Sequence, residues 1–471
     1  MQKGTGLFWF RNDLRITDNL ALQIALEESD LVIPVFLLDQ RLFKDHFLGF
    51  KKTSIFRAQF MLQSLQNLRQ SCKAKGGDLL VLIGKPEEVI PELTVRYGVN
   101  KIFASKEITW EEVKVEEALE YRLKGLSVTI QYEWQHSLVH PDDLPFGFDQ
   151  VPDVFSNYRK QIEKNCKIRK PVPAPTKIPV PDHLESYSIP SLKDLGFDQV
   201  AIELRFNGGE EEAWKRLNHY FWQQDLLKNY KFTRNGLLGE DYSSKFSPWL
   251  AHGCISPRSI HEQVKKYERE RLSNVSTYWL VFELHWRDYF RNVAAKYGNQ
   301  LFFKKGFKST SVDLKDDAEL FQKWAMAETG IPFIDANMKE LNQTGFMSNR
   351  GRQNVASFLV KDLKVNWTWG AAYFESQLID YDVTSNWGNW AYMAGVGNDP
   401  RQNRYFNIMK QAQQYDPKGV YVKHWLPQLL NLESSYVHNP TVLQDEHLQN
   451  AGVNIGDNYP KNLVPFRKWL K

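Results

Sequence analysis

Residues 378–390 read LIDYDVTSNWGNW and place two acids and two amides inside an otherwise apolar and aromatic stretch. A buried carboxylate or amide is costly unless it finds a hydrogen-bonding partner. Asp380, Asp382 and Asn386 therefore predict a polar ligand ringed by aromatic side chains, and a heteroaromatic cofactor fits this pattern. Trp390 would lie close enough to such a cofactor to exchange an electron with it. The alternative is a structural polar network in a large helical core.

The sequence around this stretch has the periodicity of packed helices. From residue 207 onward, apolar side chains recur at three- and four-residue spacing, which is typical of amphipathic helices. Residues 206–471 are therefore predicted to form an all-helical domain. The expected helices cover residues 213–227, 260–267, 275–297, 317–327, 337–343, 352–363 and 371–380.

The first 133 residues follow another pattern, in which short apolar runs alternate with helical stretches. This alternation predicts an α/β domain with a doubly wound, mostly parallel sheet over residues 1–133. Pro34 lies inside the second run, where it removes one hydrogen-bond donor from the strand. The expected strands cover residues 7–10, 31–38, 79–83, 101–104 and 128–132, and the expected helices cover residues 19–28, 54–70, 87–97 and 111–124.

Residues 134–205 are predicted to be a long connector between the two domains. The repeated prolines of residues 171–181 should give part of it an extended backbone with few hydrogen bonds. We expect this part to wrap the surface rather than to form a domain of its own.

The composition and charge of the chain limit the functions that the protein can have. The chain carries 60 Lys and Arg against 56 Asp and Glu, a net charge of +4, so binding of nucleic acid must come from local clusters of basic residues. Cys72, Cys166 and Cys254 form no C-x-x-C pair, so they predict neither a disulfide framework nor a metal site. His136 and His140 lack a nearby general-base glutamate, so they do not predict a metal site either. No signal peptide or membrane span is recognisable. We expect a soluble, cytoplasmic protein that binds no metal.

Residues 241–248, DYSSKFSP, offer a phosphate cradle. Three serine hydroxyls, the Lys245 ammonium and free backbone N–H groups precede a helical pattern, and such groups bind anions. A serine that caps the helix is the alternative. The usual glycine-rich nucleotide loops are absent, because residues 395–400 lack the third glycine of the dinucleotide fingerprint and Lys85 is followed by Pro86.

Glu283, Trp286 and Arg287 share one helical stretch. Charges four residues apart usually form an ion pair on a solvated helix face. The alternative places an acid, a stacking ring and a cation at the mouth of one cavity. Residues 347–354, MSNRGRQN, are similarly polar just ahead of an apolar helix and should lie where helix ends meet a cleft.

A basic and aromatic segment follows residue 400. Cations interleaved with rings suit a nucleic-acid backbone with stacked bases, and a solvated loop is the alternative. The cations are Arg401, Arg404, Lys410, Lys418 and Lys423, and the rings are Tyr405, Phe406, Tyr415, Tyr421 and Trp425.

Residues 9–15, WFRNDLR, with Asp18 and Asn19 resemble the opening strand and turn of the photolyase/cryptochrome family. The resemblance extends over essentially the whole chain, and its helical half is similar to the flavin domain of that family. The motifs NRGRQN, YD, NWGNW and GND, at residues 349–354, 381–382, 386–390 and 397–399, are similar to those of the DASH-type cryptochromes.

The resemblance implies FAD, held in a U shape within the helical domain. The residues implied on its phosphate side are Tyr230, Ser243, Ser244, Lys245, Phe246 and Ser247. Arg352, Asp380 and Asp382 would contact the isoalloxazine and ribityl groups, with Asn386 beside the redox-active nitrogen. The residues that would face a DNA lesion are Glu283, Trp286, Arg287, Asn349, Gln353, Tyr392 and Gln411, and Asn349 would contact the cofactor as well. The residues implied in the chemistry are Glu283, Asn349, Asn386, Trp390 and Trp367.

The implied activity is a light-driven lyase that splits cyclobutane pyrimidine dimers, with excited reduced flavin lending an electron to the flipped-out dimer. Tyr392 and Gln353 stand where the double-strand-acting photolyases have tryptophan and methionine. The pocket should therefore hold a dimer more weakly and favour single-stranded DNA. RNA is a second candidate partner, and we expect a monomer. The alternatives are a blue-light photoreceptor with little repair activity and a nucleic-acid binder without catalysis.

The resemblance also implies a second chromophore between the domains. Methenyltetrahydrofolate fits residues 107–112, with Glu111 as the candidate contact and Glu112 as the alternative.

Family members commonly carry three tryptophans that lead from the flavin to the surface. Trp390 matches the proximal one and Trp367 the middle one, but the distal position, ten residues before Trp324, is Leu314. We therefore predict slow or rerouted photoreduction, with Trp324, Trp369 or a tyrosine as the detour.

Overall fold

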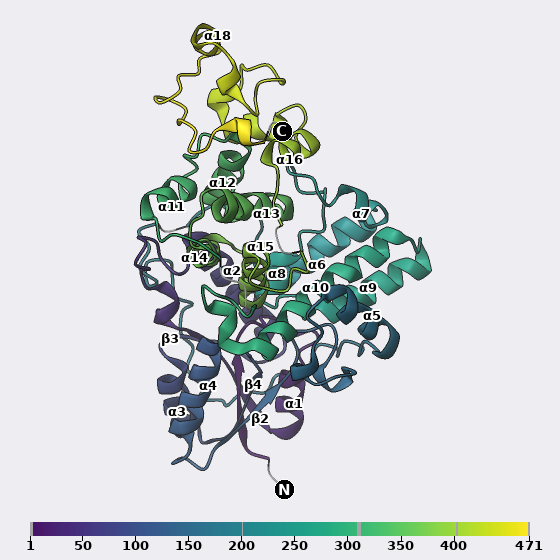
Figure 1. The fold of residues 1–471 in the computed structure, drawn as a ribbon. Helices are drawn as coiled ribbons and strands as arrows, with labels where there is room; N and C mark the ends of the chain where they lie inside the picture. The colour runs from purple at the N-terminus through teal and green to yellow at the C-terminus, as the bar shows by residue number, and fades with distance from the viewer. Residues whose placement is uncertain (1–2, 200, 309–311, 402–403, 470–471) are drawn as a thin grey trace.

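The computed structural model describes residues 3–199, 201–308, 312–401 and 404–469, which form an α/β domain and a helical domain (Figure 1). In the α/β domain, the described residues build a five-stranded sheet in the order β3-β2-β1-β4-β5, and each neighbouring pair is parallel. The prediction of a doubly wound parallel sheet is confirmed. The strands are β1 (Thr5–Phe10), β2 (Leu31–Leu38), β3 (Leu80–Ile83), β4 (Val99–Ser105) and β5 (Thr129–Glu133).

Helices cover both faces of this sheet, because successive side chains of a strand point to opposite sides. Phe8 and Phe10 of β1 pack into the core formed with α1 and α2, whereas Leu7 and Trp9 pack into the core formed with α3 and α4. The first core continues into the helical domain. The helices are α1 (Leu20–Glu28), α2 (Ile55–Ala74), α3 (Pro86–Tyr97) and α4 (Trp110–Leu123).

Strand β2 carries Pro34 and still pairs with both neighbours. It pairs with β1 over residues 31–36, but its pairing with β3 begins only at Val35. The backbone N–H of Val32 donates to the carbonyl of Pro179 in the connector at 2.8 Å. Because Val32 and Pro34 are two residues apart, their nitrogens point to the same edge. The proline therefore lies where β3 has not yet begun, and no ladder hydrogen bond is lost.

The connector of residues 134–205 contains helix α5 (Phe155–Asn165) and otherwise consists mainly of turns and extended backbone. Its proline-rich part lies along the α/β domain: Val172 exchanges hydrogen bonds with Asp18, and the N–H of Ile178 donates to the carbonyl of Lys75 at 2.9 Å. The division of the chain after residues 133 and 205 stays a prediction.

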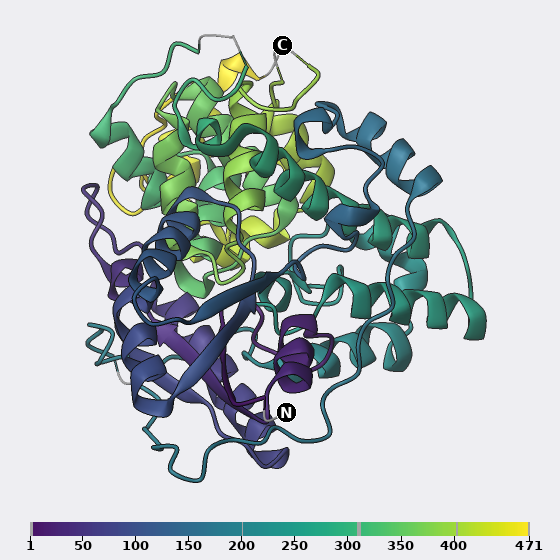
Figure 2. The ribbon, with the colours of Figure 1, turned by 90° about the horizontal axis from the view of Figure 1, so that it is seen from below.

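The helical domain lies beside the sheet in both views (Figures 1 and 2). The segment around α18 lies at the end far from the sheet (Figure 1). Two predicted helices are each followed by a π-helical turn, at His219–Gln223 after α6 and at Phe358–Asp362 after α13. Such turns are frequent near functional sites. No described helix is long and apolar enough to cross a membrane. The helices are α6 (Glu210–Asn218), α7 (Tyr230–Thr233), α8 (Ser247–Ala251), α9 (Pro257–Glu270), α10 (Val275–Tyr297), α11 (Ala318–Ala325), α12 (Pro332–Thr344), α13 (Asn349–Ser357), α14 (Trp367–Gln377), α15 (Val383–Ala394), α16 (Ile408–Tyr415), α17 (Val420–Trp425) and α18 (Asp445–Asn450).

The N-terminal signature joins the two domains. Arg258 of α9 forms a two-pronged ion pair with Asp18 at 2.6 and 3.0 Å, and both side chains are buried. Arg15 donates to the carbonyl of Gly253 at 2.8 Å. A Cβ at Gly253 would lie 1.9 Å from the carbonyl oxygen of Asn12, so only glycine allows this approach. These contacts fix the sheet against the helices that carry the site.

Candidate functional site

Asp382 is the N-cap of α15 and an ion-pair partner at the same time. Its Oδ1 accepts hydrogen bonds from the N–H of Ser385 and the hydroxyl of Thr384, each at 2.8 Å. Its Oδ2 lies 3.5 Å from the guanidinium of Arg287. Burial raises the pKa of Asp382. The charges of Arg287 and Arg291, together with the hydrogen bonds from Ser385, outweigh burial and hold this pKa below its ordinary value. The carboxylate is therefore charged and fixed in place.

Asp380 is a nearly fully buried carboxylate with one free oxygen. Its Oδ2 accepts a hydrogen bond from Arg352 at 2.8 Å, and Arg352 in turn donates to the carbonyl of Met347 at 2.9 Å. Its Oδ1 has no hydrogen-bond partner among the described residues. A buried acceptor without a partner is costly in a finished core, so this oxygen fits a ligand that donates to it.

Asn386 and Trp390 lie on α15, one helical turn apart. The amide of Asn386 donates to the carbonyl of Ala371 in α14 at 3.0 Å. Trp390 is buried, with ring centroids 5.1 Å from Phe374 and 6.1 Å from Trp324. Helices α14 and α15 thus hold the amide and the indole as one rigid unit.

Lys245 lies in the segment that the sequence predicts as a phosphate cradle. Its backbone has a φ of +58°, a strained conformation for a residue with a side chain. Its buried ammonium has no hydrogen-bond partner among the described residues and lies 3.5 Å from the ring centroid of Tyr242. Arg216 holds the segment by donating to the carbonyls of Ser243 and Ser244. No serine side chain caps α8, so the capping alternative is wrong.

The charges around Lys245 point to an anion. Burial, and next the nearby Arg205, lower the pKa of Lys245 to about 6, with further contributions from Arg216 and Arg352 that Glu340 only partly offsets. An excess of buried cations is costly, and a diphosphate would neutralise it. The free Asp380 oxygen and the free Lys245 ammonium together fit FAD, with ring donors at one end and a diphosphate at the other. Of the remaining phosphate-side residues, Tyr230, Ser244 and Phe246 are buried, Ser243 is half-buried, and Ser247 is exposed.

Glu283 pairs with Arg234 at 2.5 Å rather than with Arg287. Burial raises the pKa of Glu283, and Arg234 opposes this rise. Arg287 instead donates to the carbonyl of His136 and approaches Asp382. The expected ion pair between residues four apart is wrong, because the two side chains turn toward different partners. Arg287 thus supports the acid at the start of α15, and its predicted contact with a lesion stays untested.

Trp286 is backed by a ring from the connector. Phe155 stacks on it with ring centroids 3.7 Å apart, and Tyr392 meets it edge-on at 6.2 Å. No local sequence signal pointed to Phe155, which precedes Trp286 by more than a hundred residues. Phe290 also stacks on Trp286, with ring centroids 5.5 Å apart and planes at 30°, and the indole is half-buried.

A pocket of about 480 Å³ lies beside these rings and is rich in cations. Arg404 links it to the lesion side, because its guanidinium donates to the hydroxyl of Tyr392 at 2.8 Å and pairs with Asp399. Arg350 donates to the side chain of Gln353 at 2.8 Å. Asn349 is exposed at the start of α13. The pocket is lined by Arg350, Gln353, Arg401, Arg404, Tyr405, Phe406, Asn407, Lys410 and Gln411.

The basic and aromatic segment therefore divides in two. Its first part, up to Lys410, lines the pocket, and its role in nucleic-acid binding stays a prediction. Its second part is structural around Tyr421, which is buried and donates to Glu340 at 2.8 Å. The pattern alone could not separate the two parts, because both mix cations and rings.

Burial favours Glu112 over Glu111 as a chromophore contact. Glu111 is 61% exposed at its side chain and pairs with Lys52. Glu112 is half-buried and accepts a hydrogen bond from the hydroxyl of Thr109. Burial, followed by the charge of Glu107, raises the pKa of Glu112.

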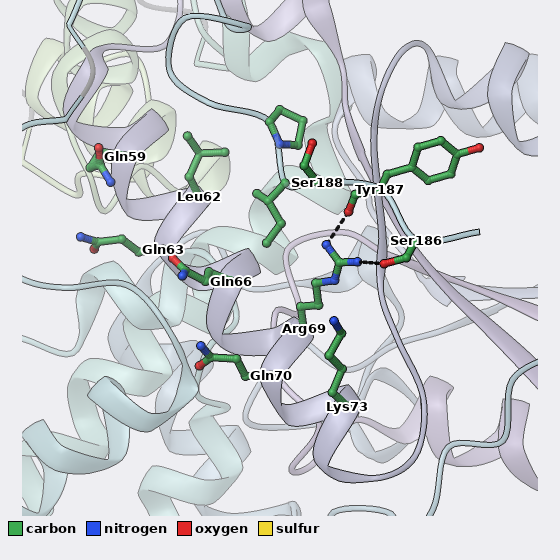
Figure 3. A pocket seen from close by; sticks show the side chains of 12 residues that line it. Gln59, Leu62, Gln63, Gln66, Arg69, Gln70, Lys73, Ser186, Tyr187 and Ser188 are labelled. Atoms are coloured by element: carbon green, nitrogen blue, oxygen red, sulfur yellow. Dashed lines mark hydrogen bonds between the residues drawn. The ribbon is translucent and has the colours of Figure 1, made fainter. Parts of the chain in front are cut away.

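A second pocket, of about 620 Å³, lies between α2 and residues 186–190 and is remote from these groups (Figure 3). Arg69 crosses it and is already bound by Asp78, Ser186 and the carbonyl of Tyr187. This arrangement attaches the connector to α2 and leaves no free charge for a ligand.

Comparisons with known proteins agree with this geometry. A family model described as the FAD binding domain of DNA photolyase matches residues 279–470, and another, described as DNA photolyase, matches residues 6–177. Cryptochrome DASH of Gloeobacter violaceus is 50% identical and covers 98% of this chain and 94% of its own length. Cryptochrome DASH of Synechocystis sp. is 49% identical and covers 98% of this chain and 96% of its own.

Solved structures show the same fold. A Synechocystis sp. cryptochrome covers 100% of this chain and 98% of its own, with a TM-score of 0.95 and 48% identity. A bacterial class III photolyase from Agrobacterium tumefaciens covers 100% of this chain and 96% of its own, with a TM-score of 0.85 and 27% identity. The chain therefore belongs to the photolyase/cryptochrome family, with a photolyase-type α/β domain followed by an FAD-binding helical domain, and is similar within it to the DASH cryptochromes.

Proposed function

We propose that the protein is an FAD-dependent, blue-light-driven lyase that splits cyclobutane pyrimidine dimers, with single-stranded DNA as its preferred substrate. The observation that carries the proposal is the cation-rich pocket beside Trp286 and Tyr392, whose described lining includes no acidic side chain. Arg404 is neutralised by Asp399 behind the pocket. The other cations remain available for a phosphate backbone.

Polar groups next to the pocket suit the edge of a pyrimidine. The side-chain oxygen of Gln411 is buried and has no hydrogen-bond partner among the described residues. Gln353 presents an amide beside Arg350, and the carboxyl of Glu283 pairs with Arg234. Amide and carboxyl groups can pair with the carbonyl and N–H groups of a flipped base.

Bound and reduced FAD would supply the electron for the reaction after it absorbs light. The chain supplies position and electrostatics. Asp380 and Lys245 would hold the two ends of the cofactor, and Asp382 would keep a negative charge at the start of α15. Trp286, supported by Phe155, would stack on the dimer and exclude water from one side of it.

The preference for single strands follows from the cost of extrusion. Taking a dimer out of a duplex costs a few kcal/mol, and taking it from a single strand costs less. The hydroxyl of Tyr392 is bound by Arg404, so this ring cannot turn freely onto a base. Fewer stacking contacts are then available to offset the cost of taking the dimer out of a duplex.

We propose methenyltetrahydrofolate as the antenna in the cleft between the domains. Glu112 is the contact that the geometry favours, because a half-buried carboxyl beside a second acid can share a proton with a pterin ring. Replacing Glu112 with Gln should reduce folate retention more than replacing the exposed Glu111.

The test is repair by chemically reduced enzyme under blue light. DNA oligonucleotides with one thymine dimer are offered as single strands and as duplexes, an RNA strand with one uracil dimer is offered beside them, and undamaged strands serve as the control. We expect repair of the single strand and slower repair of the duplex. Protein that binds flavin and photoreduces but repairs none of these substrates would instead support the photoreceptor alternative. Protein without flavin would exclude both functions.

A further inference from the structure

Tryptophan side chains of α11, α14 and α15 form two branches around Trp390. On one side, the ring of Trp390 lies against Trp324, with centroids 6.1 Å apart and planes at 79°. On the other side, Trp390 packs onto Gly370, one helical turn from Trp367. The ring that contacts Trp367 among the described residues is Trp387, with centroids 5.9 Å apart and planes at 73°.

The Leu314 position cannot extend the second branch. Leu314 is buried, and the next residue, Lys315, exchanges backbone hydrogen bonds with Lys364 and Asn366 just before Trp367. An aliphatic side chain thus lies beside the middle tryptophan. Since an aliphatic group cannot be oxidised by an indole radical, a hole on Trp367 needs another donor.

The first branch ends inside the protein. Trp324 is fully buried, and its indole N–H donates to the backbone carbonyl of Val355 at 3.1 Å. A carbonyl cannot take the proton that an oxidised indole releases. A hole on Trp324 would therefore stay charged in a medium of low dielectric constant, where an unpaired charge is unfavourable.

Trp387 has the two properties that Trp324 lacks. It is partly exposed to solvent, and its indole N–H lies 3.3 Å from the carboxylate of Glu375 and 3.3 Å from the hydroxyl of Tyr381. Glu375 is 12% exposed and lies 3.7 Å from the ammonium of Lys52. The indole of Trp387 thus has both a proton acceptor and access to external reductants.

We infer that Trp387 is the terminal electron donor of the flavin photoreduction chain and that Glu375 is its proton acceptor. This inference rests on the proposed function, because light-excited FAD, acting through Trp390, is the oxidant that creates the hole on Trp367. One electron moves from Trp387 to Trp367, the Nε1–H bond of Trp387 breaks, and the proton forms an O–H bond on Glu375. A neutral indole radical remains on Trp387. An external thiol then returns one electron and one proton to it.

The test compares photoreduction in four variants that retain FAD, with a thiol as reductant. Replacing Trp387 with Phe should slow bleaching of the oxidised flavin about tenfold or more, the change that a barrier increase of about 1.4 kcal/mol produces. Replacing Trp324 or Trp369 with Phe should leave the rate within about twofold, a barrier change of less than 0.5 kcal/mol. Trp369, named above as a candidate detour, is the matched control. Like Trp387 it is half-buried, but it lies on α14, two residues from Trp367, with Phe321 and Phe47 as its ring partners.

The fourth variant, Glu375→Gln, keeps a hydrogen-bond acceptor but cannot take a proton as a carboxylate does. Electron paramagnetic resonance and transient absorption should show a long-lived neutral indole radical in the wild type and a shorter-lived charged radical in this variant. A wild-type rate in Trp387→Phe, or a loss in Trp324→Phe instead, would overturn the inference.

Repair by chemically reduced enzyme separates this inference from the proposed function. It should be the same in Trp387→Phe and in the wild type, since repair bypasses the chain. If neither protein repairs dimers while the photoreduction rates differ as expected, the proposed function fails and the electron route stands. If both repair dimers and photoreduce equally, the electron route fails and the function stands.

Discussion

The ammonium of Lys245 shows how a single residue can indicate a binding site. Neither a carboxylate nor a carbonyl partner binds it among the described residues, and its surroundings are mostly cationic. Residues of this kind are the best indicators of a binding site, because a core without a ligand would have replaced them. The serines of the same segment are less informative, since serine is common at turns and helix ends.

Proton uptake on FAD binding should report the state of Lys245. In the apoprotein, burial and Arg205 lower the pKa of Lys245 to about 6, whereas a bound diphosphate would raise it again. Binding should therefore take up about one proton between pH 6 and the ordinary lysine pKa of about 10.4, and affinity should fall as the pH rises through this window. Calorimetric titrations of apoprotein with FAD in buffers of different ionisation enthalpy measure the uptake at pH 8.

The matched variants separate the cradle from general effects of charge. Replacing Lys245 with Met should abolish the uptake and weaken binding, while replacing the exposed Lys193 with Met should change neither. Binding of FAD by the wild type without net proton uptake would contradict the assignment of Lys245 to the phosphates.

Replacing Glu283 with Gln should lower dimer repair without loss of flavin. Under the proposed function Glu283 faces the lesion, and a hydrogen bond to a charged group contributes about 1.5–3 kcal/mol, so the repair rate should fall by about 10- to 100-fold. Repair rate per bound flavin is the measurement, and exposed Glu270→Gln on α9 is the control. A parallel loss of flavin and repair would show that Glu283 has a structural role alone.

Among the elements, the packing of α14 against α15 depends on one glycine. A Cβ at Gly370 would lie 2.3 Å from the ring of Trp390, and Trp390 cannot move away because Phe374 and Trp324 enclose it. Replacing Gly370 with Ala should therefore destabilise the protein by about 1–3 kcal/mol, the usual cost of overpacking, although alanine favours a helix more than glycine does.

Urea unfolding of Gly370→Ala should show this loss, together with a changed Trp390 fluorescence. Gly125→Ala is the control, because the space around a Cβ at Gly125 is open. Equal midpoints for Gly370→Ala and Gly125→Ala would mean that the two helices can separate without cost.

Helices and strands could be predicted from the sequence where the spacing of apolar residues was regular. All five strands and most helices lie where the apolar patterns place them, and α10 covers residues 275–297 as expected. The spacing of apolar residues did not predict the π-helical turn at Phe358–Asp362. One inserted residue rotates the apolar face of a helix by less than a turn, so the spacing still looked helical. Helix α5 was missed because it lies in a connector whose prolines dominate the sequence pattern. Helix α15 and the short helices α7, α16, α17 and α18 were not among the expected helices either.

Over the whole molecule, the site depends on contacts between distant parts of the chain. Asp380 and Lys245 could be proposed from their local sequence, since a buried charge is unusual anywhere. The partners Arg234 for Glu283 and Phe155 for Trp286 could not, because no local pattern relates residues that meet only in the folded protein. The electron route through Trp387 was missed for the same reason.

Arg258 is the residue that tests how firmly the two domains are joined. Replacing it with Met should cost about 3–5 kcal/mol, because Asp18 would keep a buried charge without its partner. Thermal unfolding should shift down, and energy transfer from an antenna in the cleft should become less efficient. Arg269→Met, on the exposed face of the same helix, is the control. Unchanged unfolding of Arg258→Met would mean that the domains are held together elsewhere.

The large sequence separation of Asp18 and Arg258 affects how the protein folds during synthesis. Asp18 and Arg258 are 240 positions apart, and a ribosome adds about 5–20 residues per second. The emerging sheet therefore waits on the order of 10–50 s with Asp18 and the apolar face of its first core open to the cell. A nascent chain halted before residue 258 should bind chaperones and be cut by proteases near Asp18, whereas a chain halted after α10 has emerged should resist both.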